Sequence, residues 1–346
     1  MTKEKNAKLS RVLKWVGYLT AIFSLCATVA GVANYLYNRA EIKKNIASLL
    51  ATESEELKSD DYSAGWRTLE KAAQLDPDSA KVRAAQEDLA MAWLENASLQ
   101  ENEKFSDITG KLEPVLTRAV ASAKPGPRQA DLRAHIGWAY FLESRDGRSD
   151  LDPTGAYREA VAEDPDNPYA QSMWGHWILW QNCRQVQEAT THFAAAIASQ
   201  REGDFARRLE MSALLNCQNH PCHLEAVRVA NDMRKERRSP DGRTRGLMLG
   251  IYFEEFNSNI AEKQEFINAV PPAEHVATFR WLFDALLISD ATNQPSAAYY
   301  LGALEEAAGQ PGDALANYRL AQRHISRDSA QGQAIDAGVK RLSRPQ

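Results

Sequence analysis

The 346-residue sequence is poor in several features that define common protein classes. Its 4 cysteines are too few for a small fold built on disulfides, and its 18 glycines and 14 prolines are too few for a collagen-like or disordered chain. A net charge of −5 lacks the basic excess of a general nucleic-acid binder. The patterns GxxxxGK[ST], GxGxxG, GxSxG and HExxH are absent from the sequence. The sequence therefore predicts a protein that is not an enzyme.

Charge is distributed unevenly along the chain. Residues 1–40 contain six basic side chains and one acidic side chain, Glu4, which gives this segment a net charge of +5. The remaining 306 residues together carry a net charge of −10. A small basic N-terminal segment thus precedes a large acidic body.

A stretch of 24 residues, from Trp15 to Asn38, contains no charged side chain. As a helix it would reach roughly 36 Å, enough to cross the ~30 Å hydrocarbon core of a bilayer. Aromatic residues stand near both of its ends, as they do at membrane–water interfaces. The sequence therefore predicts a transmembrane helix over residues 15–38. The alternatives are a cleaved signal peptide and a buried helix of a soluble domain.

Positively charged side chains flank the predicted span unequally. Five precede it, and three follow it closely: Arg39, Lys43 and Lys44. The positive-inside rule then places a basic N-terminus, residues 1–14, in the cytoplasm and the body outside it. We expect a single-pass protein of the inner (cell) membrane whose C-terminal body is periplasmic.

The body repeats a pattern of small and aromatic residues. It is clearest near the C-terminus, where Gly302 is followed by Ala314, Tyr318 and Ala321 at intervals of 12, four and three residues. Comparable sets occur upstream: Gly137, Tyr157 and Ala160, and then Gly175, Ala189, Phe193 and Ala196. Small residues at these positions would let two antiparallel helices approach closely, and the aromatic ring would fill the gap between repeats.

This pattern resembles the tetratricopeptide (TPR) repeat family, whose 34-residue units are helix–turn–helix pairs. Asn182-Cys183 recurs as Asn216-Cys217, an interval of 34 residues. The resemblance implies an all-α fold, a right-handed TPR-like helical solenoid that follows the N-terminal transmembrane helix. We expect divergent TPR-like helices over residues 41–128, a TPR array over 129–328, and a C-terminal capping helix and tail over 329–346.

Two cysteines and two histidines stand close together in the segment from Cys217 to His223. In the repeat pattern, Cys183 occupies the equivalent turn of the preceding repeat. We favour a disulfide among Cys183, Cys217 and Cys222, as an oxidising compartment allows. A transition-metal site, c-type haem attachment through a variant of the Cys-x-x-Cys-His pattern, and unpaired thiols are the alternatives. The favoured interpretation needs no metal and no cofactor.

In TPR arrays the first helix of each pair lines a concave groove, so the resemblance also indicates binding residues. The positions that it selects are Trp138, Phe141, Tyr169, His176, Trp180 and Tyr299. Aromatic anchors of this kind dominate protein interfaces. Trp174 and Trp177 fall on packing positions instead. The groove lacks the Lys/Asn set with which some TPR domains clamp an acidic C-terminus, so we do not expect a receptor for chaperone tails.

These observations predict a membrane-anchored TPR scaffold or adaptor that binds partner proteins in its groove. Envelope complexes for secretion, translocation or polysaccharide export are the expected setting, and their membrane or envelope subunits are the expected partners. We expect no nucleic acid and no small-molecule substrate. The alternatives are a haem- or metal-carrying envelope protein built on the Cys217–His223 segment, and a TPR adaptor that faces the cytoplasm.

Overall fold

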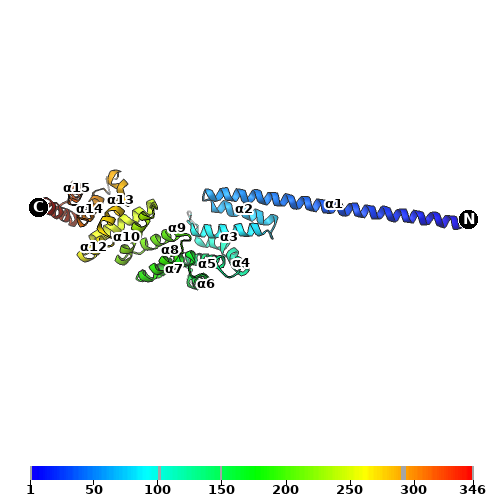
Figure 1. Cartoon of the computed structure of the whole chain (residues 1–346), viewed down its shortest axis with the longest axis horizontal. Helices are drawn as coiled ribbons and strands as arrows, with labels where there is room; N and C mark the ends of the chain where they lie inside the picture. Colours follow the sequence, from blue (N-terminus) through cyan, green and yellow to red (C-terminus); the bar gives the residue numbers. More distant parts are fainter. Residues whose placement is uncertain (1, 100–102, 149, 290–293, 345–346) are drawn as a thin grey trace. The chain divides into compact units, whose positions relative to one another are not determined.

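A computed structural model describes residues 2–99, 103–148, 150–289 and 294–344, and it leaves the side chains of residues 2–27, 30 and 285–289 undescribed. Over these ranges the fold is all-α, with sixteen helices and no strand (Figure 1). The helices belong to two compact units, Met1–Glu103 with Gly110–Leu116, and Lys104–Thr109 with Thr117–Gln346. The prediction of an all-α helical repeat fold is confirmed.

The first unit contains α1 (Thr2–Lys58), α2 (Tyr62–Leu75), α3 (Ala80–Glu95) and part of α4 (Phe105–Ser122). No glycine or proline interrupts residues 32–58, so α1 continues from the predicted span into the first repeat without a break. Near its C-terminal end, Ile46 forms a buried cluster with Ala72 of α2 and Val82 of α3. The C-terminal part of α1 therefore acts as the first helix of a pair, and α2 acts as the second.

Within the described part of the chain, no helix combines the length and the apolar character needed to cross a membrane. The predicted span, residues 15–38, falls mostly on residues 15–27 and 30, whose side chains lie outside the description.

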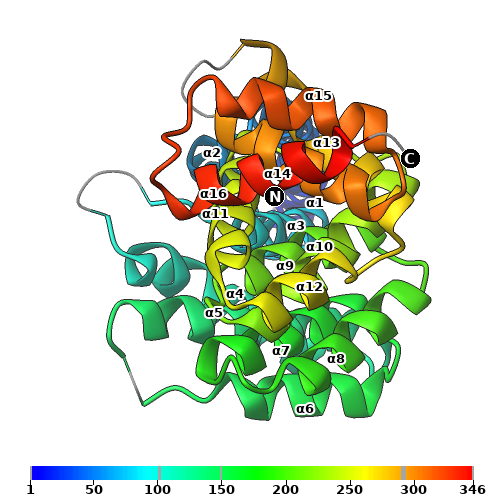
Figure 2. The ribbon, with the colours of Figure 1, turned by 90° about the vertical axis from the view of Figure 1, so that its left-hand side faces the viewer.

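The second unit is an array of helices stacked in pairs (Figures 1 and 2). After α4 it contains α5 (Pro127–Arg145), α6 (Pro153–Glu163), α7 (Pro168–Gln181), α8 (Val186–Ala198), α9 (Gly203–Leu215), α10 (His220–Lys235), α11 (Gly242–Asn257), α12 (Ile260–Ile267), α13 (Pro272–Ser289), α14 (Gln294–Ala307), α15 (Pro311–Gln322) and α16 (Ala330–Leu342). The helices α5 and α6, α7 and α8, and α14 and α15 pack against each other as antiparallel pairs. Contacts of α5 with α7, and of α7 with α9, join the first helices of successive pairs into one core.

A glycine and an aromatic ring meet inside each of these three pairs. The partners are Gly137 with Tyr157, Gly175 with Phe193, and Gly302 with Tyr318. The three rings are only 0%, 0% and 3% exposed. A Cβ atom on any of the three glycines would lie at most 3.1 Å from its aromatic partner, so the glycines let the helices approach this closely. The small and aromatic residues that mark the repeat in the sequence thus form the contact between paired helices.

The last helix packs against the final pair. Tyr318 lies between Gly302 of α14 and Gly338 of α16, where a Cβ atom on Gly338 would stand 2.7 Å from the tyrosine Cε2. Figure 2 shows α14, α15 and α16 together at one end of the second unit, in orange to red. The α16 helix lies within residues 329–346, the segment predicted as a capping helix and tail.

Candidate functional site: an aromatic cluster on α5 and α7

The six predicted groove residues differ widely in exposure. Trp138, Phe141, His176 and Tyr299 are 7%, 1%, 7% and 2% exposed, Tyr169 is half-buried, and Trp180 is 48% exposed. Neighbouring helices pack so closely that four of these side chains fill the space between them. Four of the six predicted groove residues are therefore buried, and Trp180 is the one of the six with a large exposed apolar surface.

Rings from α5 and α7 form a continuous aromatic cluster of Trp138, Phe141, His176, Trp177 and Trp180. Phe141 lies at its centre, with ring centroids 4.7 Å from Trp138, 5.0 Å from His176, 6.0 Å from Trp177 and 5.4 Å from Trp180. Three of these contacts are edge-on, an arrangement that aromatic quadrupoles favour. The buried rings thus hold Trp180 in a defined orientation at the surface.

Arg145, one turn beyond Phe141 on α5, adds positive charge beside the aromatic cluster. Its guanidinium lies 4.7 Å from the ring centroid of Phe105 and 5.8 Å from that of Trp180, within the range of cation–π attraction. Burial lowers the pKa of Arg145, and the nearby positive charge of Arg243 on α11 lowers it further. The carboxylate of Asp146 acts on Arg145 in the opposite sense. The guanidinium of Arg145 is thus the positive charge placed beside Trp180. The sequence pattern gave no indication of Arg145, because its role depends on these contacts between helices.

His176 contributes a buried polar atom to the aromatic cluster. Burial lowers the pKa of His176 to about 3, and the charge of Arg145 acts in the same direction, so the imidazole is neutral at physiological pH. Its Nδ1 is buried and has no hydrogen-bond partner. Buried polar atoms usually have partners, so this nitrogen is an exception within the aromatic cluster.

The remaining predicted residues lie elsewhere. Tyr169 packs between His135 and Phe205, with ring centroids 4.7 Å and 5.1 Å away. Tyr299 lies on α14, where its hydroxyl accepts a hydrogen bond from Lys263 Nζ at 2.7 Å. The structure therefore brings together Trp138, Phe141, His176 and Trp180, and it separates Tyr169 and Tyr299 from them.

The two tryptophans expected on packing positions are half-buried. Trp174 packs on His192, with ring centroids 4.6 Å apart. The indole Nε1 of Trp177 donates a hydrogen bond to Thr154 Oγ1 at 2.9 Å. Trp177 thus links α7 to α6 and also supports the aromatic cluster.

Cys183 and Cys217 lie at successive turns of the array, and Cys222 lies near the start of α10. Cys183, after α7, and Cys217, after α9, form a disulfide that joins neighbouring repeats. A bridge between Cys217 and Cys222 would instead have closed a single turn. Cys222 is a buried free thiol, and burial raises its pKa to about 11.

The two histidines of the same segment bind a buried carboxylate. Nδ1 of His220 lies 2.7 Å from one oxygen of Glu255, and Nδ1 of His223 lies 2.5 Å from the other. Glu255, on α11, is 3% exposed, so the two imidazoles provide the hydrogen bonds that its carboxylate needs. No three His, Cys, Asp or Glu side chains are grouped so as to hold a metal ion in the part of the chain that the structure describes.

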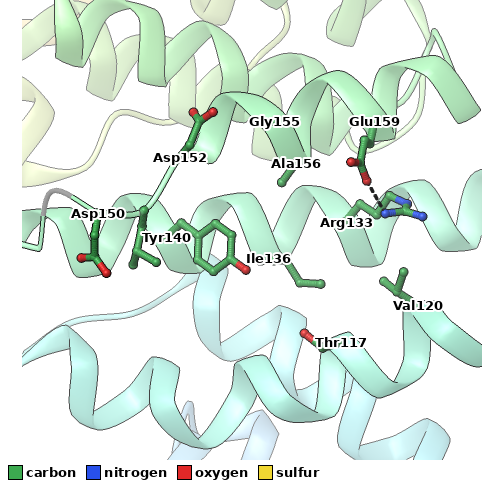
Figure 3. Close-up of a pocket in the computed structure, with 11 residues that line it drawn as sticks. Thr117, Val120, Arg133, Ile136, Tyr140, Asp150, Asp152, Gly155, Ala156 and Glu159 are labelled. Atoms are coloured by element: carbon green, nitrogen blue, oxygen red, sulfur yellow. Dashed lines mark hydrogen bonds and ion pairs between the residues drawn. The ribbon is translucent and has the colours of Figure 1, made fainter.

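A pocket of about 550 Å³ lies between α4, α5 and α6 (Figure 3). Ile136 and Tyr140 of α5 form part of its wall, and Arg133 forms an ion pair with Glu159 at its edge. Asp150, on the same rim, is paired with Arg148. Since these charges already have partners within the protein, we locate the functional site at the aromatic cluster rather than in this pocket.

Comparison with known proteins found similarity to solved structures alone. No protein-family model and no curated protein matches the chain. Among solved structures, a tetratricopeptide repeat protein from Parabacteroides merdae ATCC 43184 is 12% identical, with a TM-score of 0.39 over 87% of this chain and 100% of that one. The TPR domain of P58(IPK) is 11% identical, with a TM-score of 0.19 over 86% of this chain and 97% of that one. The structural neighbours are thus TPR proteins, and the resemblance concerns helical repeats.

Proposed function

We propose that this protein is a non-catalytic scaffold that binds partner proteins at the aromatic cluster, with Trp180 and Arg145 as the main contacts. The observation that carries the proposal is the exposure of Trp180, 48%, beside the buried ring of Phe141, which is 1% exposed. Tryptophan and arginine are enriched among the residues that contribute most to protein–protein binding. A ring held in place before binding loses little conformational entropy when a partner covers it, which favours affinity.

The charge of the site indicates what kind of partner segment fits. Arg145 and Arg243 repel each other, since the positive charge of Arg243 lowers the pKa of Arg145. An acidic group of a partner would relieve this repulsion. A partner segment that places an apolar side chain on Trp180 and a carboxylate near Arg145 would match the surface.

The binding test uses the full chain purified in detergent, with crosslinking to identify bound proteins. We expect Trp180→Ala and Arg145→Ala each to weaken capture of the main partner by roughly 30-fold, the loss expected for a hot spot worth about 2 kcal/mol. Phe253→Ala is the matched control, because this residue on α11 is 56% exposed and lies outside the aromatic cluster. If folded Trp180 and Arg145 variants keep all partners, the proposal is wrong.

We also propose that residues 15–38 anchor the chain in the inner membrane, with the repeat units outside the cytoplasm in an envelope complex. The support is the charge-free stretch of 24 residues and its flanking positive charges. A disulfide between Cys183 and Cys217 is consistent with an oxidising compartment. Reporters fused to the C-terminus test the orientation, and activity confined to a cytoplasmic reporter would overturn it.

A further inference from the structure

A second pocket, of about 470 Å³, lies at the C-terminal end of the second unit. Its walls come from α12, α14, α15 and α16, and its smallest lining residues are Ala303, Ala307, Ala334 and Ala337. The volume falls within the range of small-molecule binding sites. Three charged side chains line it: Lys263, Glu306 and Arg341.

Lys263 enters this pocket between aromatic rings. Its Nζ lies 4.9 Å from the ring centroid of Phe256 and 5.2 Å from that of Tyr299, and it donates a hydrogen bond to the Tyr299 hydroxyl at 2.7 Å. No carboxylate among the described residues forms an ion pair with it, and its neighbour Glu265 contacts His220 instead. Burial lowers the pKa of Lys263, as expected for an amine that lacks a counter-charge.

The other two charged side chains of the pocket, Glu306 and Arg341, form an ion pair with each other. Glu306 accepts hydrogen bonds from Arg341 Nε at 2.5 Å and from a terminal guanidinium nitrogen of Arg341 at 2.7 Å, and it also accepts one from the Tyr318 hydroxyl at 3.0 Å. Because Glu306 and Arg341 cancel, the pocket carries one unmatched positive charge, on Lys263. A half-buried cation is costly without a compensating charge, so an anion that enters the pocket would gain from this charge.

Tyr299 supplies a second donor to the same point. Its hydroxyl oxygen accepts from Lys263, which leaves the hydroxyl proton free to be donated in turn. Burial raises the pKa of Tyr299 to about 12, so the proton is retained at physiological pH. An ammonium group and a hydroxyl 2.7 Å apart can bind two oxygens of one anionic group.

We propose that this pocket binds a small organic carboxylate, whose oxygens accept hydrogen bonds from Lys263 Nζ and the Tyr299 hydroxyl. The single negative charge of a carboxylate matches the single unmatched charge of Lys263, whereas a dianion would bring a second negative charge that no unpaired cation of the pocket balances. The alanines leave room for a short apolar body behind the carboxylate. A free organic acid and the C-terminus of a peptide share this chemistry, and the test separates them.

The experiment measures saturation-transfer difference NMR of three probes with the full chain: propionate, N-acetyl-Ala-Ala, and its carboxamide. We expect saturable transfer to propionate, to N-acetyl-Ala-Ala or to both, and none to the amide. Binding at least tenfold tighter for one acid identifies the source as a free acid or a peptide terminus. Absence of saturable transfer to both acids, or equal transfer to the amide, overturns the proposal.

Variants of the lining residues test whether the acid binds in this pocket. Lys263→Met should weaken binding of the preferred acid at least tenfold, and Tyr299→Phe should weaken it less, since it removes one neutral donor. Lys340→Met is the matched control, because Lys340 is exposed on α16 and is not among the lining residues. Equal binding by folded Lys263→Met protein contradicts the proposal. Trp180→Ala should leave acid binding unchanged, so this site can fail or succeed independently of partner binding at the aromatic cluster.

Discussion

Gly137 of α5 lies so close to Tyr157 of α6 that a Cβ atom at position 137 would stand 2.6 Å from the tyrosine Cε1. The tyrosine ring is fully buried, and its hydroxyl has no hydrogen-bond partner. The ring is therefore held by packing alone. Close approach of these two helices thus depends on the missing side chain at residue 137.

We expect Gly137→Ala to lower the free energy of unfolding by about 1–3 kcal/mol, because the added methyl group overpacks the contact with Tyr157. Gly246→Ala is the control, since a Cβ atom at this position of α11 meets nothing within 4 Å. That change should raise the free energy of unfolding by about 0.5–1 kcal/mol through helix propensity. Urea unfolding of the full chain measures both, and equal effects would contradict the packing role of Gly137.

The disulfide between Cys183 and Cys217 closes a loop across neighbouring repeats, with a sequence separation of 34 residues. We expect Cys183→Ser to lower the free energy of unfolding by about 2–4 kcal/mol, because the bridge restricts the unfolded chain. Dithiothreitol should lower the unfolding midpoint of the wild type and leave that of Cys183→Ser unchanged. A wild-type midpoint that does not respond to reduction would show that the bridge is absent or contributes nothing.

His176 makes the protein sensitive to acid. The folded state holds its pKa at about 3, whereas the ordinary value is 6.5, so between these values only the unfolded state binds the proton. Stability from this residue is therefore complete above pH 6.5 and is lost as the pH falls, by about 2 kcal/mol between pH 6.5 and 5. We expect His176→Phe to remove this part of the slope in unfolding free energy against pH.

Trp138→Phe is the control for His176→Phe, because the ring centroids of Trp138 and His176 lie 5.1 Å apart. This variant alters the same packing and keeps the titrating group, so it should lower stability at every pH without changing the slope. A slope that is unchanged in His176→Phe would show that this histidine is not buried in its neutral form.

Glu210 of α9 gives the unfolding free energy a dependence on pH opposite to that of His176. Burial raises its pKa to about 7, although Arg207, 2.9 Å away, partly opposes the shift. The folded state then retains a proton that the unfolded state releases near 4.5, so stability falls as the pH rises between these values. We expect a loss of about 2 kcal/mol between pH 5 and pH 7. The Glu210→Gln variant should not lose this stability between pH 5 and pH 7. If its unfolding free energy depends on pH as that of the wild type does, Glu210 is not the group responsible.

The repeat itself was accessible from sequence because its contacts are local. Gly302 and Tyr318 belong to adjacent helices, so a fixed spacing along the chain reports their contact directly. The same holds for Gly175 and Phe193. Pattern and packing therefore coincide wherever the two partners belong to one helix pair.

The candidate site was predictable only in part. Repeat spacing selected Trp138, Phe141, His176 and Trp180 as groove residues, and the structure does bring their rings together. The repeat spacing did not distinguish Trp180, which is 48% exposed, from Trp138, which is 7% exposed. Burial depends on how closely the next pair of helices stacks, and the spacing does not contain this information. The repeat spacing also did not select Arg145, because its partners Phe105 and Trp180 lie on other helices.

The sequence by itself determined the helical repeat, the charge-free stretch at residues 15–38 and the positions of the cysteines at equivalent turns. Only the tertiary structure decided that Cys183 pairs with Cys217, that Tyr299 turns inward to accept a hydrogen bond from Lys263, and that Trp180 remains exposed. The physical reason is how far apart the interacting residues lie along the chain. Helix formation and pairing follow from residues near one another along the chain, whereas exposure, disulfide partners and unmatched charges depend on side chains that stacking brings together from different repeats.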